Sequence, residues 1–179
     1  MSKSYFEPLV IGGEPVDLLH LEPFTLLVPS LLAKKTLRVR VTYSTHCFSE
    51  KYGAIPHPPS DPIIDIDTKQ HRTFCPIRYG LSKSLPAVIQ GMTDSDVFQT
   101  SAVRNWVYSI TIENPAGPYH VFFEVNRASV EQRTWQDLNL VVESAYPEDD
   151  SPPSVRGKKP FALVCGEVYT GQRHRPKKR

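Results

Sequence analysis

Long apolar runs and dense cysteine spacing are both missing from this chain of 179 residues. No apolar stretch approaches the ~20 residues that a membrane helix needs, and the first residues lack the sustained apolar core of a secretion signal. The three cysteines, Cys47, Cys75 and Cys165, are an odd number without the spacing of a disulfide scaffold. These absences predict a cytoplasmic protein with reduced cysteines and no membrane partner.

The motifs of several large enzyme classes are also missing. The sequence has no phosphate-cradling glycine loop, no dinucleotide fingerprint and no serine-hydrolase elbow. His46, Cys47, His57, His71 and Cys75 are residue types that bind zinc. However, adjacent His and Cys do not easily face one metal, and no Cys-x-x-Cys pair exists. A zinc site is therefore a minor alternative, and we expect neither a metal nor another cofactor.

Net charge is small, at +2, so the chain as a whole is not a polyanion-binding protein. The charge is uneven, because residues 172–179 form a basic tail that either solubilises the chain or steers it towards a polyanion. The chain has seventeen prolines against nine glycines, and eight of the prolines lie in residues 55–62 and 146–160, which marks these segments as irregular connections. We expect an N-terminal β arm at 1–36 that belongs to the same fold, one domain at 37–171 and a flexible tail.

Alternating and helical patterns predict the elements of that domain. A Gly-Gly turn between apolar runs predicts an N-terminal hairpin around residues 9–19. Residues 24–28, 37–43, 106–112, 119–125, 138–144 and 161–168 are strand candidates. Residues 79–92 have a helical period, with Pro86 tolerated in a first turn if a serine caps the helix. The order predicts an α+β fold, a curved antiparallel sheet of four or five strands packed by one main helix.

His46 stands where the strand of residues 37–43 stops, flanked by Ser44, Cys47 and Ser49. Strand ends on a rigid scaffold often carry functional side chains. Imidazole titrates near neutral pH, which suits a general acid or base. A structural histidine that is hydrogen-bonded at a strand end explains the same pattern.

Three cations approach the start of the predicted helix. Arg72 and Arg78 bracket residues 73–77, and Lys83 follows. Backbone amides at a helix N-terminus favour anions, so this cluster predicts a phosphate-binding site. The alternative is a solvated basic face whose stems pack on Phe74 and Tyr79.

A late strand ends in Glu143, Ser144, Ala145, Tyr146 and Pro147. If the pleat continues, Ser144 and Tyr146 project together and could contact a phosphate or donate to a leaving oxygen. Alternatively, Tyr146 is an edge aromatic that closes the core.

Three blocks, YSTHCFS at 43–49, RTFCPIRYGLSKSLP at 72–86 and VESAYP at 142–147, resemble an uncharacterised bacterial and prophage family. Its members tend to be labelled stationary-phase growth adaptation or heat-shock-like proteins, which implies a role in the stress response. The likeness spans about residues 37–171 and implies no particular chemistry.

The order of elements also resembles the barnase, EndoU, colicin and RelE group of metal-independent ribonucleases, many of which are toxins. That resemblance implies cleavage of RNA by attack of its 2′-hydroxyl on the adjacent phosphate. His46, Tyr146 and Ser144 would be the catalytic residues, and Arg72, Arg78 and Lys83 would bind phosphate. Several such enzymes use two histidines, and His120 is the candidate for the second. RNA and an antitoxin or another protein are then the expected partners.

The rival hypothesis is a non-catalytic protein that regulates a prophage or stress response by binding a protein or nucleic acid. The same strand-end surface would serve it. In that case Trp106, Tyr108 and Phe122 matter more than His46, because aromatic side chains supply contact area without chemistry.

Overall fold

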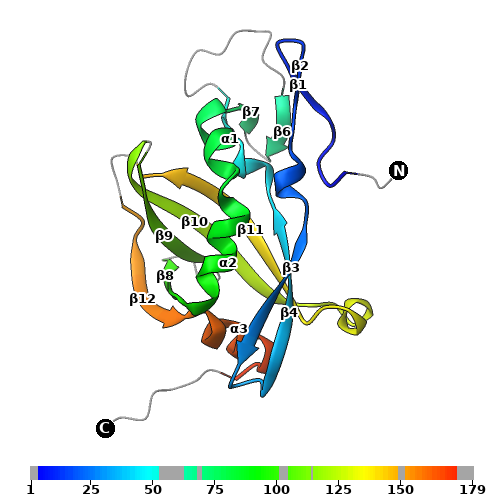
Figure 1. Cartoon of the computed structure of the whole chain (residues 1–179), viewed down its shortest axis with the longest axis vertical. Coiled ribbons are helices and arrows are strands. Elements are labelled where there is room, and N and C mark those ends of the chain that lie inside the picture. The colour runs from blue at the N-terminus through cyan, green and yellow to red at the C-terminus, as the bar shows by residue number, and fades with distance from the viewer. Residues whose placement is uncertain are drawn as a thin grey trace.

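The computed structural model describes residues 4–52, 63–67, 70–100, 105–113, 115–148 and 152–172. In these ranges α, β and η denote α-helices, strands and 3₁₀-helices (Figure 1). In chain order the elements are β1 (Leu9–Ile11), β2 (Glu14–Val16), η1 (Leu19–Leu21), β3 (Phe24–Ser30), β4 (Lys35–Tyr43), η2 (Thr45–Cys47), β5 (Ser49–Lys51), β6 (Ile63–Asp67), β7 (Gln70–Phe74), α1 (Pro76–Ser82), α2 (Leu85–Gly91), η3 (Met92–Asp94), β8 (Asp96–Thr100), β9 (Asn105–Glu113), β10 (Ala116–Arg127), η4 (Glu131–Thr134), β11 (Leu138–Pro147), β12 (Val155–Pro160) and α3 (Phe161–Thr170). The basic tail from residue 173 onward and His57 lie outside the described residues.

The main sheet corrects the expected fold. Within the described residues it has seven strands in the order β12-β8-β9-β10-β11-β4-β3, so a sheet of four or five strands is wrong. It is also mixed rather than antiparallel, because β11 pairs with β4 in parallel, Leu138 opposite Val39 and Val142 opposite Tyr43. This pairing joins segments about a hundred residues apart, which local patterns do not reveal. A smaller sheet, β5-β7-β6, lies beside it.

The single main helix is also corrected, because the described chain contains three α-helices. Residues 161–168, predicted as a strand, belong to helix α3. Valine and cysteine in this segment favour a strand only weakly, and packing overrides such preferences. Gly171 ends the helix with a left-handed φ of 73°. Gly166 lies so close to Ser30 that an added Cβ would be 2.5 Å from its Oγ, which lets α3 approach β3.

The helical period of residues 79–92 is real, but the segment is divided into α1 and α2. Pro86 lies in the first turn of α2, where a missing N–H costs little. No helix in the described part of the chain has the length and apolar character required to cross a bilayer.

The predicted N-terminal hairpin is confirmed, and the predicted strands at 106–112 and 119–125 form a second hairpin. β1 and β2 pair around Gly12 and Gly13, both at positive φ. β9 and β10 pair from Ala116 opposite Glu113 to Glu124 opposite Asn105. β3 runs past the predicted residue 28 and includes Pro29, because β3 is an edge strand of the sheet and needs no N–H donor at that position.

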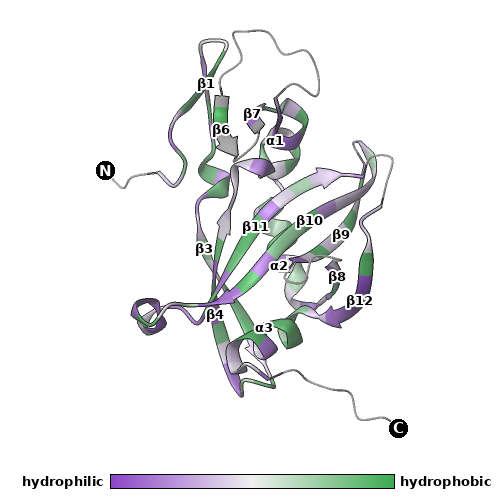
Figure 2. Ribbon diagram, turned by 180° about the vertical axis from the view of Figure 1, so that it is seen from behind, coloured by the Kyte–Doolittle hydropathy of each residue, from purple (hydrophilic) through white to green (hydrophobic). Residues whose placement is uncertain are grey.

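The core lies between the sheet and helices α2 and α3. Tyr119, Val121 and Phe123 of β10 are buried in one cluster with Ile89 of α2 and Phe161 of α3. Figure 1 shows α1 and α2 in front of the sheet, and Figure 2, from behind, shows β10 and β11 in front of α2. The alternate residues of β10, such as His120 and Phe122, therefore point to the other face.

Candidate functional site

The parallel pairing of β4 and β11 stops at Tyr43 and Val142, and β11 continues for five more residues. The space beside this overhang is occupied by η2, with Ser44 donating its backbone N–H to Val142 O at 2.9 Å and its hydroxyl to Glu143 O at 2.6 Å. Ser44 Oγ also caps η2 by accepting from His46 N at 3.0 Å. The block at 43–49 is thus a tight turn that is hydrogen-bonded to β11.

His46 and Glu143 line one open pocket of about 460 Å³, together with Tyr5, Phe6, Tyr43, Ser44 and Thr45. Burial, with a smaller contribution from Glu124, raises the pKa of the Glu143 carboxyl above its ordinary value. A carboxyl with a raised pKa that lines the same pocket as a histidine supplies the two kinds of group required for general acid and base catalysis. Glu143 was not a predicted catalytic residue, and only its place in β11, lining the same pocket as His46, reveals it.

Arg78 joins η2 to the end of β11. Its Nη1 donates to His46 O at 3.3 Å and to Ser49 O at 3.2 Å, while its Cζ lies 5.2 Å from the centre of the Tyr146 ring. The Tyr146 ring stacks on Phe122, with centroids 5.2 Å apart and an interplanar angle of 17°. Arg78, Tyr146 and Phe122 form a continuous stack, which we call the cation–aromatic stack.

The predicted residues therefore meet in part. Arg78 contacts the backbone oxygen of His46 and the ring of Tyr146, and Ser144 lies opposite Phe122 in the register. Whether these residues are catalytic stays a prediction.

Arg72 lies close to Arg78 but is buried. Its guanidinium donates to Ser49 Oγ at 2.9 Å and to Ser49 O at 2.8 Å, and only 5% of the residue is exposed. These bonds tie β7 to β5 and leave the side chain away from the surface that a phosphate would approach. This placement favours a structural role for Arg72.

Lys83 is the C-cap residue that follows α1. Its Nζ is 4.8 Å from the centre of the Tyr79 ring, and the Tyr79 hydroxyl donates to Asp17 O near η1. Lys83 therefore follows the alternative interpretation, a basic side chain packed on Tyr79. Of the three predicted phosphate ligands, Arg78 is the one that reaches the stack.

Cys47, in the block at residues 43–49, is buried and unreactive. Cys47 donates to Val142 O at 3.7 Å, and burial raises its pKa to about 12. A thiol in that state is not a nucleophile near neutral pH. No cluster of three His, Cys, Asp or Glu side chains able to hold a metal occurs among the described residues.

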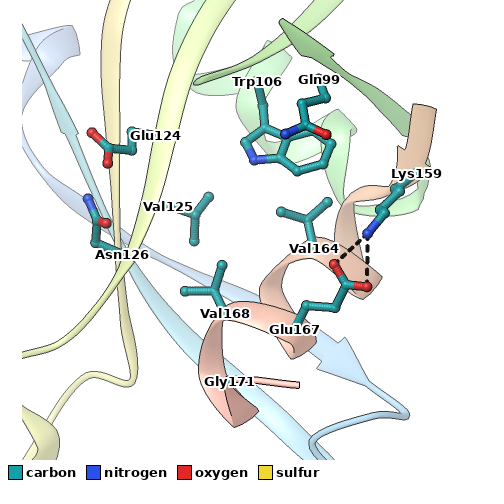
Figure 3. Close-up of a pocket in the computed structure, with 10 residues that line it drawn as sticks. All are labelled: Gln99, Trp106, Glu124, Val125, Asn126, Lys159, Val164, Glu167, Val168 and Gly171. Atoms are coloured by element: carbon teal, nitrogen blue, oxygen red, sulfur yellow. Dashed lines mark hydrogen bonds and ion pairs between the residues drawn. The ribbon is translucent and has the colours of Figure 1, made fainter. Parts of the chain in front are cut away.

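A second pocket, of about 400 Å³, lies between α3 and strands β8, β9 and β10 (Figure 3). Trp106, Val164 and Val168 line its apolar part. The Lys159 ammonium donates to both oxygens of Glu167, at 2.9 and 2.7 Å. Gln99, Glu124 and Asn126 add polar groups to the wall, and none of the predicted catalytic residues lines it. This arrangement favours a packing role.

Comparisons with known proteins agree with the expected bacterial family. The model of the YjaZ family matches residues 8–169. Protein YjaZ of Escherichia coli (strain K12) is 30% identical over 142 residues, which are 79% of this chain and 76% of that protein. No solved structure matches the chain. The likeness to ribonucleases finds no support in these matches and stays a hypothesis. Because the family model spans most of the sequence, including η2, α1 and β11, the chain belongs to the YjaZ family.

Proposed function

We propose that the chain is a ribonuclease-like protein that holds single-stranded RNA on the cation–aromatic stack and cleaves it at the His46–Glu143 pocket. The observation that carries the proposal is the stack itself, because Arg78 over Tyr146 over Phe122 offers a charge for phosphate and flat rings for bases. Splayed bases stack on aromatic and guanidinium planes in many RNA sites.

The pocket adjoins the stack through the His46 backbone, which accepts a hydrogen bond from Arg78. In the proposed reaction the RNA 2′-oxygen forms a bond to the adjacent phosphorus and gives its proton to one of His46 and Glu143. The 5′-oxygen leaves with a proton from the other group. The products are a 2′,3′-cyclic phosphate and a 5′-hydroxyl end. Arg78 and Ser144 would stabilise the charge that develops on the phosphate oxygens.

Cleavage is tested with a 5′-labelled RNA of about twelve nucleotides, resolved on a denaturing gel. His46→Gln and Glu143→Gln should each lower the cleavage rate by about 10²–10⁴-fold, the usual worth of a general acid or base. A matched oligonucleotide with 2′-deoxyriboses should bind equally and remain intact, because it lacks the nucleophile. Unchanged cleavage in both variants would overturn the catalytic assignment.

Binding is tested separately by fluorescence anisotropy at several salt concentrations. Tyr146→Leu should weaken RNA binding by about 1–3 kcal/mol, the usual worth of one stacked base. Arg78→Gln should reduce the salt slope by about 0.7, the value for one phosphate contact on a single strand. Arg133→Gln is the matched control, because it removes one exposed charge at the other end of β11. Equal effects of the two arginine variants would count against the stack.

A second candidate function is binding without cleavage, in which the stack holds a nucleic acid or a protein partner such as an antitoxin. The observation that favours it is the engagement of Arg78 Nη1 by two backbone carbonyls, His46 O and Ser49 O. A guanidinium held this way offers fewer donors to a transition state. Salt-dependent RNA affinity with no product on the gel would select this function.

A further inference from the structure

A chain of three polar side chains lies on the face of the sheet that points away from α2 and α3. Ser109 of β9 is directly opposite His120 of β10, and Ser109 Oγ is 2.7 Å from His120 Nδ1. On the other side of the ring, His120 Nε2 is 3.0 Å from Glu148 Oε2. The Glu148 backbone N–H donates to Pro118 O at 2.8 Å, which anchors this residue beside β10.

The direction of these bonds follows from the chemistry of the groups. An ionised carboxylate only accepts hydrogen bonds, so the Glu148 contact requires a proton on His120 Nε2. When the imidazole is neutral, Nδ1 then has a lone pair and accepts from Ser109. In that neutral tautomer the Ser109 hydroxyl is the donor, and its proton points at a base. This is the arrangement of an activated serine, with the roles of the two ring nitrogens exchanged relative to the serine-protease order.

The positions of the three residues suit that role. His120 is 4% exposed, and its ring lies edge-on to Phe122 and Tyr146, at centroid distances of 6.3 and 6.4 Å. Ser109 is exposed. A rigid, buried base therefore holds a hydroxyl that opens to solvent, which limits the reorganisation required for reaction.

We propose that Ser109 is a nucleophile activated by His120, with Glu148 as the positioning residue, and that it reacts with acyl esters that have good leaving groups. Ser109 Oγ forms a bond to the acyl carbon and its proton passes to His120 Nδ1. The bond to the leaving oxygen breaks, and that oxygen takes the proton from His120. Water then hydrolyses the acyl-serine. This activity is separate from the proposed action on RNA, because it uses neither His46 nor Arg78.

The test uses a fluorophosphonate probe on the intact protein. Ser109 Oγ would bond to phosphorus, fluoride would leave, and the proton would pass to His120. Peptide mass spectrometry should find the adduct on Ser109, formed at least about 100-fold faster than on Ser129, as expected from general-base assistance. Ser129 is the internal control, because it is exposed and its hydroxyl bonds to the Glu131 carboxylate, with no imidazole contact among the described residues. Equal labelling of the two serines would overturn the proposal without any variant.

Variants then separate activation from folding. Glu148→Gln should slow labelling about 10-fold or more, and Glu148→Asp should restore part of the rate, with both melting temperatures close to the parent value. A structural role alone would not produce rescue by the shorter carboxylate. Unchanged labelling in Glu148→Gln would overturn the relay. Ser109→Ala should abolish the adduct and leave RNA affinity unchanged, so failure here and failure of the proposed RNA function are distinguishable.

Discussion

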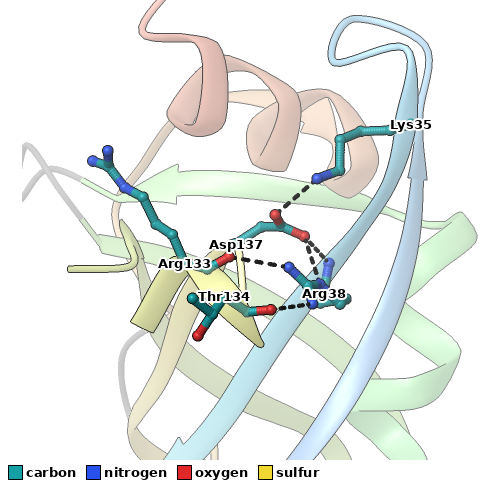
Figure 4. A network of polar contacts seen from close by, with 5 residues as sticks. All are labelled: Lys35, Arg38, Arg133, Thr134 and Asp137. Carbon is teal, nitrogen blue, oxygen red and sulfur yellow. Dashed lines mark hydrogen bonds and ion pairs between the residues drawn. The ribbon is translucent and has the colours of Figure 1, made fainter. Parts of the chain in front are cut away.

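Two carboxylates of the β11 region, Asp137 just before the strand and Glu143 within it, lie in opposite environments. Just before the strand, Asp137 accepts from Lys35 Nζ at 2.8 Å, from Arg38 N at 2.7 Å and from Arg38 Nε at 3.3 Å (Figure 4). Arg38 also donates to the backbone oxygens of Arg133 and Thr134, which ties η4 to β4. Beyond the strand's middle, Glu143 lines an open pocket with His46.

The pKa values move in opposite directions for physical reasons. Burial would raise the pKa of Asp137, but the hydrogen bonds from Lys35 and Arg38 outweigh it and hold that pKa below its ordinary value. Burial and the nearby Glu124 raise the pKa of Glu143. A carboxylate whose charge is satisfied stabilises the fold, whereas one whose charge is costly is typical of a functional site. The difference distinguishes a structural carboxylate, Asp137, from Glu143, which lines the candidate site.

The largest expected effect comes from removing the charge of the structural carboxylate, Asp137. Asp137→Asn should lower the free energy of unfolding by about 2–3 kcal/mol near neutral pH, because bonds from charged donors are lost. An Asp with a depressed pKa contributes stability above its unfolded value of about 3.9, and this is lost as pH falls through the folded value. The difference between parent and variant should therefore shrink below about pH 4. Urea denaturation at several pH values measures it, and a constant difference would contradict the assignment.

The two arginines near η2 provide the next test. Arg72→Met should cost about 2 kcal/mol of stability, since it removes two buried charged hydrogen bonds to Ser49. Arg78→Gln should lower the free energy of unfolding by less than Arg72→Met does, and it should weaken RNA binding by more. Thermal unfolding and anisotropy on the same two variants measure both quantities. Equal losses of stability and equal RNA affinities in the two variants would contradict the different roles assigned to Arg72 and Arg78.

A smaller effect of opposite sign is expected at Glu143. Because the fold raises its pKa, the folded state favours the protonated carboxyl, and stability falls as pH rises from the unfolded value of about 4.3 through the folded one. Glu143→Gln removes that loss, so the variant should match the parent at low pH and exceed it at neutral pH by less than about 1 kcal/mol. Chemical denaturation in the pH 3–8 range would reveal a reversed slope if the carboxylate were instead stabilised.

The smallest effect concerns the core beside η2. Among the described residues, the buried hydroxyls of Tyr43 and Tyr119 have no hydrogen-bond partner. Removing a buried hydroxyl without a partner releases its desolvation cost, so Tyr43→Phe should be neutral or stabilising by up to about 1 kcal/mol. If Tyr43→Phe instead lowered the free energy of unfolding by more than about 1 kcal/mol in the same denaturation experiment, a buried water would bond to the hydroxyl.

How far the sequence predicts the fold depends on the range of each signal. The alternation in residues 37–43 and the hairpin of β9 and β10 follow from local pattern and turn chemistry. The strand predicted for residues 161–168 is wrong, because the apolar residues of this segment also suit a short helix on β3 and β10. Tertiary packing decides between strand and helix. The parallel contact of β4 with β11 has no local signature.

The candidate site divides in the same way. His46, Arg78 and Tyr146 could be selected because strand ends and helix starts are visible in the sequence. Spacing along the chain did not distinguish Arg72 from Arg78, because burial against Ser49 separates them. Ser109 and Glu148 carried no signal, since their contact with His120 requires the register of β9 against β10 and the position of the chain after β11.

The sequence by itself determined which segments alternate, where glycine and proline turn the chain, and a resemblance to an uncharacterised bacterial family, because these depend on neighbouring residues. Only the tertiary structure decided which charges are satisfied and which are costly. The environment of Asp137, Glu143 and His120 is built by strands and helices far apart in the chain, and burial and long-range contacts set the energy of a charge.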